Sequence, residues 1–287
     1  MNRLASISNP LQEQAEQLAA ALPPLLVEAE RLAASVSLGV HGRRKAGMGE
    51  SFWQFRRYAP EDPAASVDWR QSAKSQHLFV REREWEAAQT VWFWRDASAN
   101  MNFKSGGTSK RARADLLLLA LASLLVRGGE RVGFVGMEGA PASSRLALTR
   151  MGRAMFSGNG AALPPRIPFK RGNQLVWFSD FLDDGVIESM KGLSREGVEG
   201  HLVRIVDPAE EDFPYSGRTR FESPRGGEDE IFGRAERIRN SYRARFTAHG
   251  EQIAEAAMKL GWTCTVHRTD HTPQVSLIAL HAAIGGT

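Results

Sequence analysis

The chain of 287 residues lacks the features that would place it among disulfide-stabilised or membrane-spanning proteins. Its one cysteine, Cys264, has no partner for a disulfide within the chain, so we expect a reducing compartment. The N-terminal residues turn polar before any signal-peptide core begins. The longest largely apolar run, residues 116–126, is much shorter than the roughly 18 residues that span a membrane. We therefore expect a cytoplasmic protein with no membrane span.

The chain also has little net charge, because 37 basic residues face 33 acidic ones. Such mild basicity is weak support for binding to nucleic acid. A helix predicted at residues 228–260 carries arginines that could form a basic stripe, but a solvated helix face explains them better. Tyr242 and Phe246, which lie among them, are expected in the core. The arginines are Arg234, Arg237, Arg239, Arg243 and Arg245.

Residues 1–85 predict a small subdomain of helices and strands. The apolar spacing of the first forty residues predicts two helices, which break at Pro23-Pro24 because proline clashes in a helix interior. Residues 39–50 alternate glycines with basic side chains and predict a flexible loop. This loop lacks the glycine–lysine–Ser/Thr order of a phosphate-binding loop. Aromatic stretches at 51–58 and 78–85 predict strands.

Residues 86–287 predict one α/β domain, because apolar strands alternate with helices along the chain. The alternation indicates a doubly wound, mainly parallel sheet with helices on both faces. Strands are predicted at 90–95, 131–137, 174–181, 200–207 and 262–267, with a further strand at 145–148 beside the second. Helices are predicted at 110–127, 183–195, 228–260 and 273–283.

Acidic side chains follow several of these strands, and in such sheets ligands bind at the carboxyl ends of the strands. Asp96 follows the first strand, Asp180 and Asp207 stand at the ends of the third and fourth, and Asp270 lies just past the last. Asp96, Ser98 and Asp180 could offer Mg²⁺ the oxygen ligands it prefers. A helix N-cap, which stabilises a helix by roughly 0.5–2 kcal/mol, would explain Asp96 or Asp183 singly. It explains the grouping less well.

The N-terminal strands and their turn resemble the signature region of the family called domain of unknown function 58. The resemblance covers residues 39–101 most specifically and most of the chain more weakly. The residues that carry it are Gly49-Glu50-Ser51-Phe52, Phe55-Arg56-Arg57-Tyr58, Glu61-Asp62, Val67-Asp68-Trp69-Arg70, Leu78-Phe79-Val80-Arg81-Glu82 and Asp96-Ala97-Ser98-Ala99-Asn100. We expect Asp68 and Arg70 to be structural, as pairing or capping residues.

The resemblance implies a von Willebrand factor A-like fold with a small N-terminal subdomain. It also implies a MoxR-type AAA+ ATPase as partner, in the assembly or maturation of a client protein complex, and no enzymatic activity. The fold implies a metal-ion-dependent adhesion site, in which Asp96, Ser98 and Asp180 match the ligand pattern. Asn100 stands where a second serine belongs, and Thr149 is the candidate for the threonine ligand.

Two classes of function therefore compete. The leading hypothesis is a non-catalytic protein-interaction module, in which a degenerate adhesion site could hold Mg²⁺. The alternative is a metal-dependent nuclease or phosphatase, because clustered strand-end carboxylates suit two-metal phosphoryl chemistry. Against the alternative, no Asp-x-Asp pair follows the first strand and no histidine lies near Asp96 in the sequence.

Overall fold

The chain folds as two units, one of residues 1–41 with 89–287 and one of residues 42–88. The computed structural model describes residues 10–40, 52–60, 62, 67–83, 88–157, 160–224, 226 and 229–285. Residues 41–50 of the predicted basic loop lie outside this set. The N-terminal helix belongs to the larger unit, whose second segment begins at Gln89.

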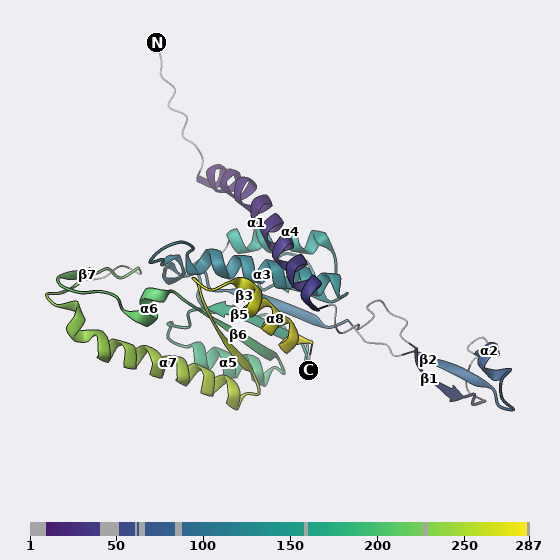
Figure 1. Cartoon of the computed structure of the whole chain (residues 1–287). Helices are drawn as coiled ribbons and strands as arrows, with labels where there is room; N and C mark the ends of the chain where they lie inside the picture. The colour runs from purple at the N-terminus through teal and green to yellow at the C-terminus, as the bar shows by residue number, and fades with distance from the viewer. Residues whose placement is uncertain are drawn as a thin grey trace, which may run out of the picture. The chain divides into compact units, whose positions relative to one another are not determined.

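A five-stranded parallel sheet forms the centre of the larger unit (Figure 1). Every neighbouring pair is parallel, in the order β4-β3-β5-β6-β9. This confirms the α/β prediction. The central strand is buried along its whole length, as expected for a strand covered on both faces. The strands are β3 (Thr90–Arg95), β4 (Arg131–Phe134), β5 (Gln174–Ser179), β6 (Glu199–Val206) and β9 (Thr263–Arg268).

Helices cover both faces of this sheet (Figure 1). One group contains α1 (Pro10–Val40), α3 (Lys110–Arg127), α4 (Arg145–Phe156) and α8 (Pro273–Ile284), which contact one another. The other group contains α5 (Val186–Arg195) and α7 (Arg239–Lys259). Among the described residues, no helix has both the length and the apolar character needed to cross a membrane.

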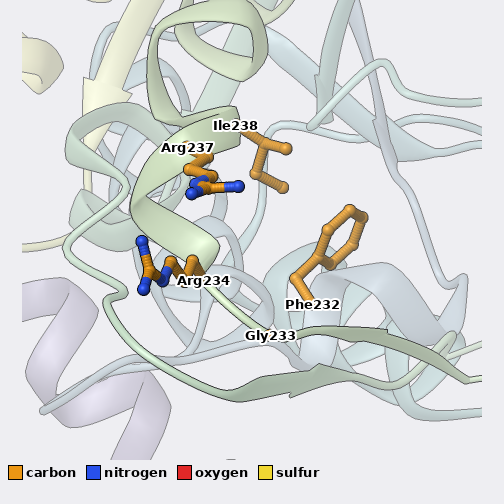
Figure 2. A pocket seen from close by; sticks show the side chains of 5 residues that line it. All are labelled: Phe232, Gly233, Arg234, Arg237 and Ile238. Carbon is orange, nitrogen blue, oxygen red and sulfur yellow. The ribbon is translucent and has the colours of Figure 1, made fainter.

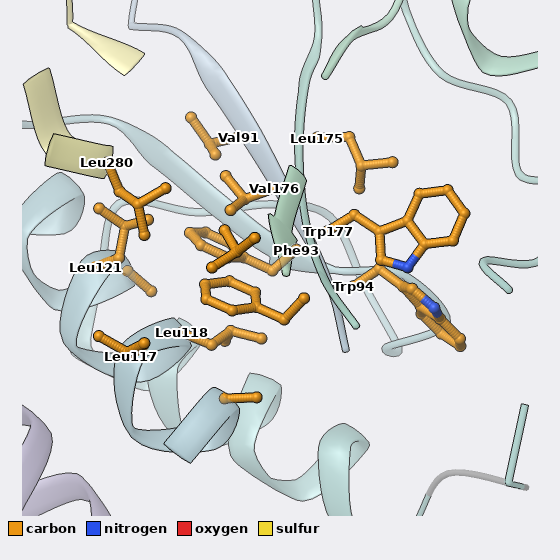
Figure 3. Packing of buried hydrophobic residues seen from close by; sticks show 14 of the residues in the cluster. Val91, Phe93, Trp94, Leu117, Leu118, Leu121, Leu175, Val176, Trp177 and Leu280 are labelled. Atoms are coloured by element: carbon orange, nitrogen blue, oxygen red, sulfur yellow. The ribbon is translucent and has the colours of Figure 1, made fainter. Parts of the chain in front are cut away.

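The core lies between the sheet and the leucine-rich helix α3 (Figure 3). Phe93 and Val176 of the sheet pack toward Leu118 and Leu121 of α3, and all four are fully buried. Each side chain of this size contributes roughly 1.5–3 kcal/mol when it leaves water. This explains why α3 is apolar nearly all round: sheet, α1 and α8 surround it.

Helix α1 runs unbroken through Pro23 and Pro24, so the predicted break is wrong. Both prolines are exposed, while Leu22, Ala29 and Ala33 on the same helix are buried. Packing of this apolar side therefore offsets the hydrogen bonds that the prolines cannot donate. Tertiary contacts decide the conformation here, as they often do where local preference is contrary.

Two other predicted elements differ from the structure. Residues 145–148 form the first turn of α4 rather than a strand, and the antiparallel bridge to Val132 is made by Ala142. The predicted helix at 228–260 begins only at Arg239. Before it lie β8 (Glu230–Phe232) and the 3-10 turn η3 (Ala235–Ile238).

A small hairpin that the sequence did not predict pairs β8 with β7 (Thr219–Phe221). Aromatic rings beneath it explain why it forms: Phe213 stacks on Phe221 with ring centroids 5.7 Å apart, and Phe221 meets Phe232 edge to face. Tyr242 of α7 joins the same cluster. Tyr242 and Phe246 are only half-buried and lie outside the main core, so the prediction that they are core residues is wrong.

The smaller unit pairs β1 (Phe52–Arg57) with β2 (Phe79–Arg83) in antiparallel fashion. The short helix α2 (Trp69–Ser72) lies in the connection, and Asp68 caps it by accepting a hydrogen bond from the backbone N–H of Gln71. The capping role expected for Asp68 is confirmed. Ser72 ties α2 to the hairpin, because its Oγ accepts from the backbone N–H of Phe79.

The close approach of β6 to the Trp262 ring gives a test of this packing. A Cβ placed at Gly200 would lie 2.0 Å from Cε3 of Trp262, so Gly200→Ala forces the ring from its buried site. We expect a loss of about 3 kcal/mol in the free energy of unfolding, measured by urea denaturation. The matched control is Gly192→Ala in α5, where nothing lies within 4 Å and about 1 kcal/mol should be gained. Equal stabilities of the two variants would contradict this packing.

Candidate functional site

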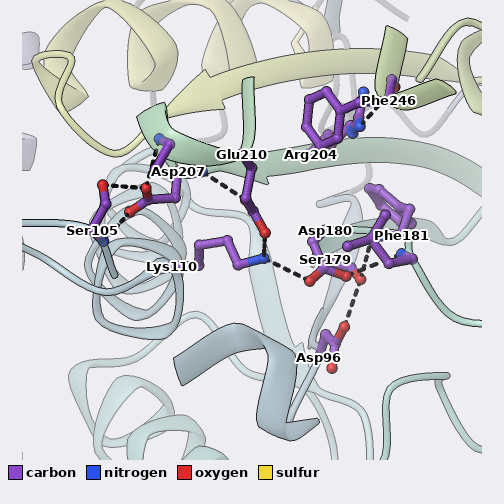
Figure 4. Close-up of polar contacts among 12 residues, drawn as sticks. Asp96, Ser105, Lys110, Ser179, Asp180, Phe181, Arg204, Asp207, Glu210 and Phe246 are labelled. Atoms are coloured by element: carbon purple, nitrogen blue, oxygen red, sulfur yellow. Dashed lines mark hydrogen bonds and ion pairs between the residues drawn. The ribbon is translucent and has the colours of Figure 1, made fainter. Parts of the chain in front are cut away.

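The strand order reverses between β3 and β5, which are neighbours in the sheet although β4 separates them along the chain. In doubly wound sheets, the crevice at such a switch point binds ligands. Asp96 follows β3 and Asp180 follows β5, so the structure brings the two predicted carboxylates together at this point (Figure 4). Both are almost fully buried.

Asp96 is held by hydrogen bonds on both carboxylate oxygens. Oδ1 accepts from the backbone N–H of Ser98 at 2.7 Å, and Oδ2 accepts from the Ser179 hydroxyl at 2.7 Å. Burial raises the pKa of Asp96, and the charge of Asp180 adds to this, while the bonds from Ser179 and Ser98 oppose it. Asp96 therefore serves to bind the end of β3 to the end of β5.

Asp180 forms a buried ion pair with Lys110, the first residue of α3. Nζ of Lys110 lies 2.8 Å from Oδ2 of Asp180 and 2.5 Å from Oε1 of Glu210. Oδ1 of Asp180 accepts from the backbone N–H of Leu182. The ammonium, which is fully buried, thus joins the helix after β3, the loop after β5 and the segment after β6.

The opposite charges of Lys110, Asp180 and Glu210 stabilise one another's ionised forms in a buried environment. Burial opposes the charge of Lys110, but Asp180 and Glu210 outweigh it and hold the pKa of the lysine above its ordinary value. Burial raises the pKa of Glu210, and Lys110 counters this. The Phe103 ring covers the ammonium, with 5.9 Å from Nζ to the ring centroid.

Asp207, at the end of β6, is a helix cap. It caps α6 (Pro208–Asp212) in a capping box. The Asp207 carboxylate accepts from the backbone N–H of Ala209, and the Glu210 carboxylate accepts from the backbone N–H of Asp207. Its other bonds come from the backbone N–H and the hydroxyl of Ser105. Asp207 therefore fixes the position of Glu210, which faces Lys110.

Ser98 is the remaining predicted ligand that lies at the site. Its hydroxyl lowers the pKa of Asp96, yet its buried Oγ meets no partner in hydrogen-bond geometry within the described residues. Asn100 lies in the 3-10 turn η2 (Ala99–Asn102), and Thr149 lies in α4. Across the described ranges, no hydrogen bond joins Asn100 or Thr149 to either carboxylate, so their roles as ligands stay predictions.

The other acidic residues near strand ends lie elsewhere. Asp270 is exposed and pairs with Arg268, which also contacts Glu211 and Asp212. Asp183 is not the cap of α5, because that position belongs to Gly185 with φ of 86°. No hydrogen bond or ion pair joins Asp270 to Lys110 or Asp96 in the described part of the chain.

These residues do not fit a resident Mg²⁺ while Lys110 keeps its position. Asp96 and the Ser98 hydroxyl offer suitable oxygens, but Asp180 is paired with an ammonium. Two like unit charges about 4 Å apart repel by roughly 4 kcal/mol at an effective dielectric constant of about 20, and a divalent ion doubles this. Among the described residues, no group of three or more His, Cys, Asp or Glu side chains is arranged to hold a metal ion.

The loop after β5 contains backbone strain. Phe181 has φ of 57° although it is not glycine, and its ring is fully buried against Trp177. Its N–H donates to the Ser179 hydroxyl, and its carbonyl accepts from Nε2 of His249 at 2.7 Å. Strain of this kind is often found at functional loops, where the surroundings enforce it. Leu182, the next residue, is exposed, while its backbone N–H donates to Oδ1 of Asp180.

A second buried ion pair involves Arg95, the residue that precedes Asp96 in the chain. Nε of Arg95 is 2.8 Å from Oδ1 of Asp115 in α3, and Nη2 donates to the Met155 carbonyl. Arg111 donates to the carbonyls of Ala97 and Ser98. A pocket of about 260 Å³ opens here, lined by Trp94, Arg95, Ala97, Phe134, Met155 and Pro165 among others.

A shallower hollow of about 600 Å³ lies by the β7–β8 hairpin (Figure 2). Its lining residues, none of which belongs to the carboxylate site, are Phe232, Gly233, Arg234, Arg237 and Ile238. Of the predicted basic stripe, Arg239 donates to the carbonyls of Phe213 and Tyr215. The stripe is therefore divided between structural and solvent-facing arginines.

Sequence reasoning missed Lys110, the residue at the centre of the site. One signal was available. A lysine at the first position of an apolar helix is unfavourable, because the helix dipole favours acidic groups there. This unfavourable position indicates that a buried carboxylate compensates the charge of the lysine. Glu210 and Ser105 gave no comparable signal, because their roles depend on contacts about 100 residues away in sequence.

The fold and site thus define a doubly wound α/β protein whose switch point holds an internally paired charge cluster. The family model described as "Protein of unknown function DUF58" matches residues 54–252, and the chain belongs to this family. The chain is 25% identical over 273 residues to "Uncharacterized protein Mb1516" of Mycobacterium bovis, covering 88% of this chain and 86% of that protein. "Uncharacterized protein Rv1480" of Mycobacterium tuberculosis matches to the same extent.

Two solved structures are similar to parts of the chain. One is the "conserved hypothetical protein BatB" from Bacteroides thetaiotaomicron, with a TM-score of 0.41 and 14% identity over 69% of this chain and 98% of that one. The other is an "aerotolerance-related membrane protein" from Bacteroides fragilis, with a TM-score of 0.40 and 15% identity over 70% of this chain and 100% of that one.

Two buried histidines of the sheet lie apart from the carboxylate cluster. Nδ1 of His201 lies 2.9 Å from the Thr263 hydroxyl, and Nδ1 of His267 lies 2.7 Å from the Ser276 hydroxyl. Burial lowers the pKa of His201. Burial lowers the pKa of His267 to about 4, and the positive charge of Arg113 adds to this. Both are therefore neutral near pH 7.

This low pKa predicts sensitivity to acid. Unfolding exposes His267, which then takes up a proton near pH 6.5. Stability contributed by the neutral ring is present above pH 6.5 and is lost as the pH falls toward 4, at about 1.4 kcal/mol per pH unit. His267→Asn, which can still bond Ser276, should therefore lose less stability than the wild type between pH 7 and pH 5. Urea denaturation at both values measures this, and parallel losses would contradict it.

Proposed function

We propose that the chain is a non-catalytic protein-interaction module with a von Willebrand factor A-like fold. The observation that carries the proposal is the pairing of Lys110 with Asp180 and Glu210 at the switch point. Ligands of doubly wound sheets bind at this point, yet these charges already satisfy one another. A cluster of this kind suits a rigid recognition surface better than proton transfer or phosphoryl transfer.

The surroundings of the cluster support recognition of another protein. Phe103, whose ring covers Lys110, is 38% exposed. Leu182, two residues after Asp180, is 40% exposed. The 260 Å³ pocket beside Ala97 provides a concave surface next to the same strand ends. Exposed apolar side chains near a pocket are typical anchors of protein interfaces.

The partner we propose is a MoxR-type AAA+ ATPase, acting with this chain in the cytoplasm on a client protein complex. Support for this partner comes from membership of the DUF58 family together with the resemblance described above.

The alternative, a metal-dependent nuclease or phosphatase, requires strand-end carboxylates that are available to metal ions. Asp180 and Glu210 instead pair with Lys110, and Asp207 caps α6. No observation on the described residues favours this alternative, so it is not adopted.

The proposed surface can be tested with Leu182→Glu. A buried charge at an interface anchor should weaken capture of a MoxR-type ATPase from the same genome by at least about tenfold, which corresponds to 1.4 kcal/mol. Binding would be measured with purified proteins by biolayer interferometry, with and without ATP.

The control is Met258→Glu, which alters an apolar side chain that is 75% exposed, near the end of α7. It should bind like the wild type, and the melting temperatures of both variants should match that of the wild type. Equal capture of the ATPase by the wild type and Leu182→Glu would remove this surface from the proposal.

A further inference from the structure

Lys110 is a cation that the chain itself supplies to the switch-point site. Its ammonium contacts Asp180 and Glu210, and its backbone N–H donates to the Phe103 carbonyl at 3.2 Å. The start of α3 therefore fixes the lysine in place from its main chain as well as from its side chain. Figure 4 shows the Lys110 ammonium between the carboxylates of Asp180 and Glu210. Ser179, the neighbour of Asp180 in the chain, donates its hydroxyl hydrogen bond to Asp96.

We propose that Lys110 replaces the divalent cation of a von Willebrand factor A-like site, so that this chain binds no Mg²⁺ at the strand ends and contacts its partner without metal. The part of this inference that concerns the partner rests on the proposed function. The part that concerns the cation rests on the described residues alone.

Both acceptors of the lysine are set in place by other contacts. Glu210 is held by the capping box of α6, since its Oε2 accepts from the backbone N–H of Asp207 at 2.9 Å. Asp180 is held by the N–H of Leu182 at 3.0 Å. Two fixed carboxylates on either side of one buried ammonium form a site whose charge is provided before any ion arrives.

The ligands expected of an adhesion site are in turn committed elsewhere. Asp96 accepts from Ser179 and from the N–H of Ser98, and neither bond involves Lys110. Ser98 Oγ stays as a buried oxygen without a hydrogen-bond partner among the described residues. This half of the site keeps metal-like donors, whereas the Asp180 half is taken by the lysine.

If Lys110 takes the place of a metal ion, removing its ammonium should allow a divalent cation to bind in its place. The full-length wild type should show no binding of Mg²⁺ or Mn²⁺ by calorimetry at millimolar metal, and its melting temperature should be the same with Mg²⁺ or with EDTA. Lys110→Ala should melt lower, because two buried carboxylates lose their counter-charge. Mn²⁺ should then raise its melting temperature by roughly 3–5 °C at about ten times the dissociation constant.

Two controls make the result specific. Lys191→Ala removes an exposed lysine that pairs with Glu188, and it should respond to no metal. Lys110→Ala combined with Asp180→Asn should lose the response to Mn²⁺ that Lys110→Ala shows. If Lys110→Ala does not fold, the metal titration of the wild type still tests the inference. Lys110→Met, which keeps more of the side-chain volume, then replaces Lys110→Ala in the measurements with Mn²⁺.

One outcome overturns the inference: stoichiometric Mg²⁺ or Mn²⁺ binding by the wild type that Asp96→Ala abolishes. ATPase capture that persists in EDTA supports the metal-independent contact, and capture lost in EDTA and restored by Mg²⁺ overturns it. Failure to capture any MoxR-type ATPase counts against the proposed function only, because the metal titrations do not depend on a partner.

Discussion

The Lys110 ammonium, buried between Asp180 and Glu210, is the interaction on which the rest of the site depends. It joins three segments that each follow a strand of the sheet: the start of α3, the loop after β5 and helix α6. Removing one member of such a buried group leaves an uncompensated charge, which costs roughly 3–5 kcal/mol. The cluster therefore fixes how three loops lie relative to one another at the switch point.

A second set of contacts keeps this face rigid. Ser179 links Asp96 to the turn at Phe181, and His249 of α7 holds the carbonyl of that strained residue. Arg95, the last residue of β3, forms a buried ion pair with Asp115 of α3. Because buried ion pairs add little net stability compared with apolar packing, their presence here suits geometric specificity, whereas the leucines of α3 supply the stability.

The sequence predicted the sheet and α3 well because their patterns are local: a continuous apolar strand such as β3, or a leucine-rich helix with a clear start at Lys110. It misjudged α1, where packing overrides two prolines, and residues 228–238, where a hairpin forms over aromatic rings distant in sequence. That Asp96 and Asp180 lie at the same edge of the sheet followed from their positions at the carboxyl ends of parallel strands. The role of Lys110 did not, because Glu210 and Asp180 reach it only through the tertiary fold.

An internally compensated site changes what recognition at this face requires. In the adhesion site that the resemblance implies, oxygen ligands hold a divalent cation, and affinity for a partner depends on that exchangeable ion. With Lys110 in that role, the positive charge is fully buried and covered by Phe103, and it cannot reach a partner's carboxylate. Under the proposed function, affinity comes from the side chains that remain exposed, Phe103 and Leu182, and from the pocket beside Ala97. The face is thus suited to shape and apolar contact, with the charges beneath it setting the positions of the loops.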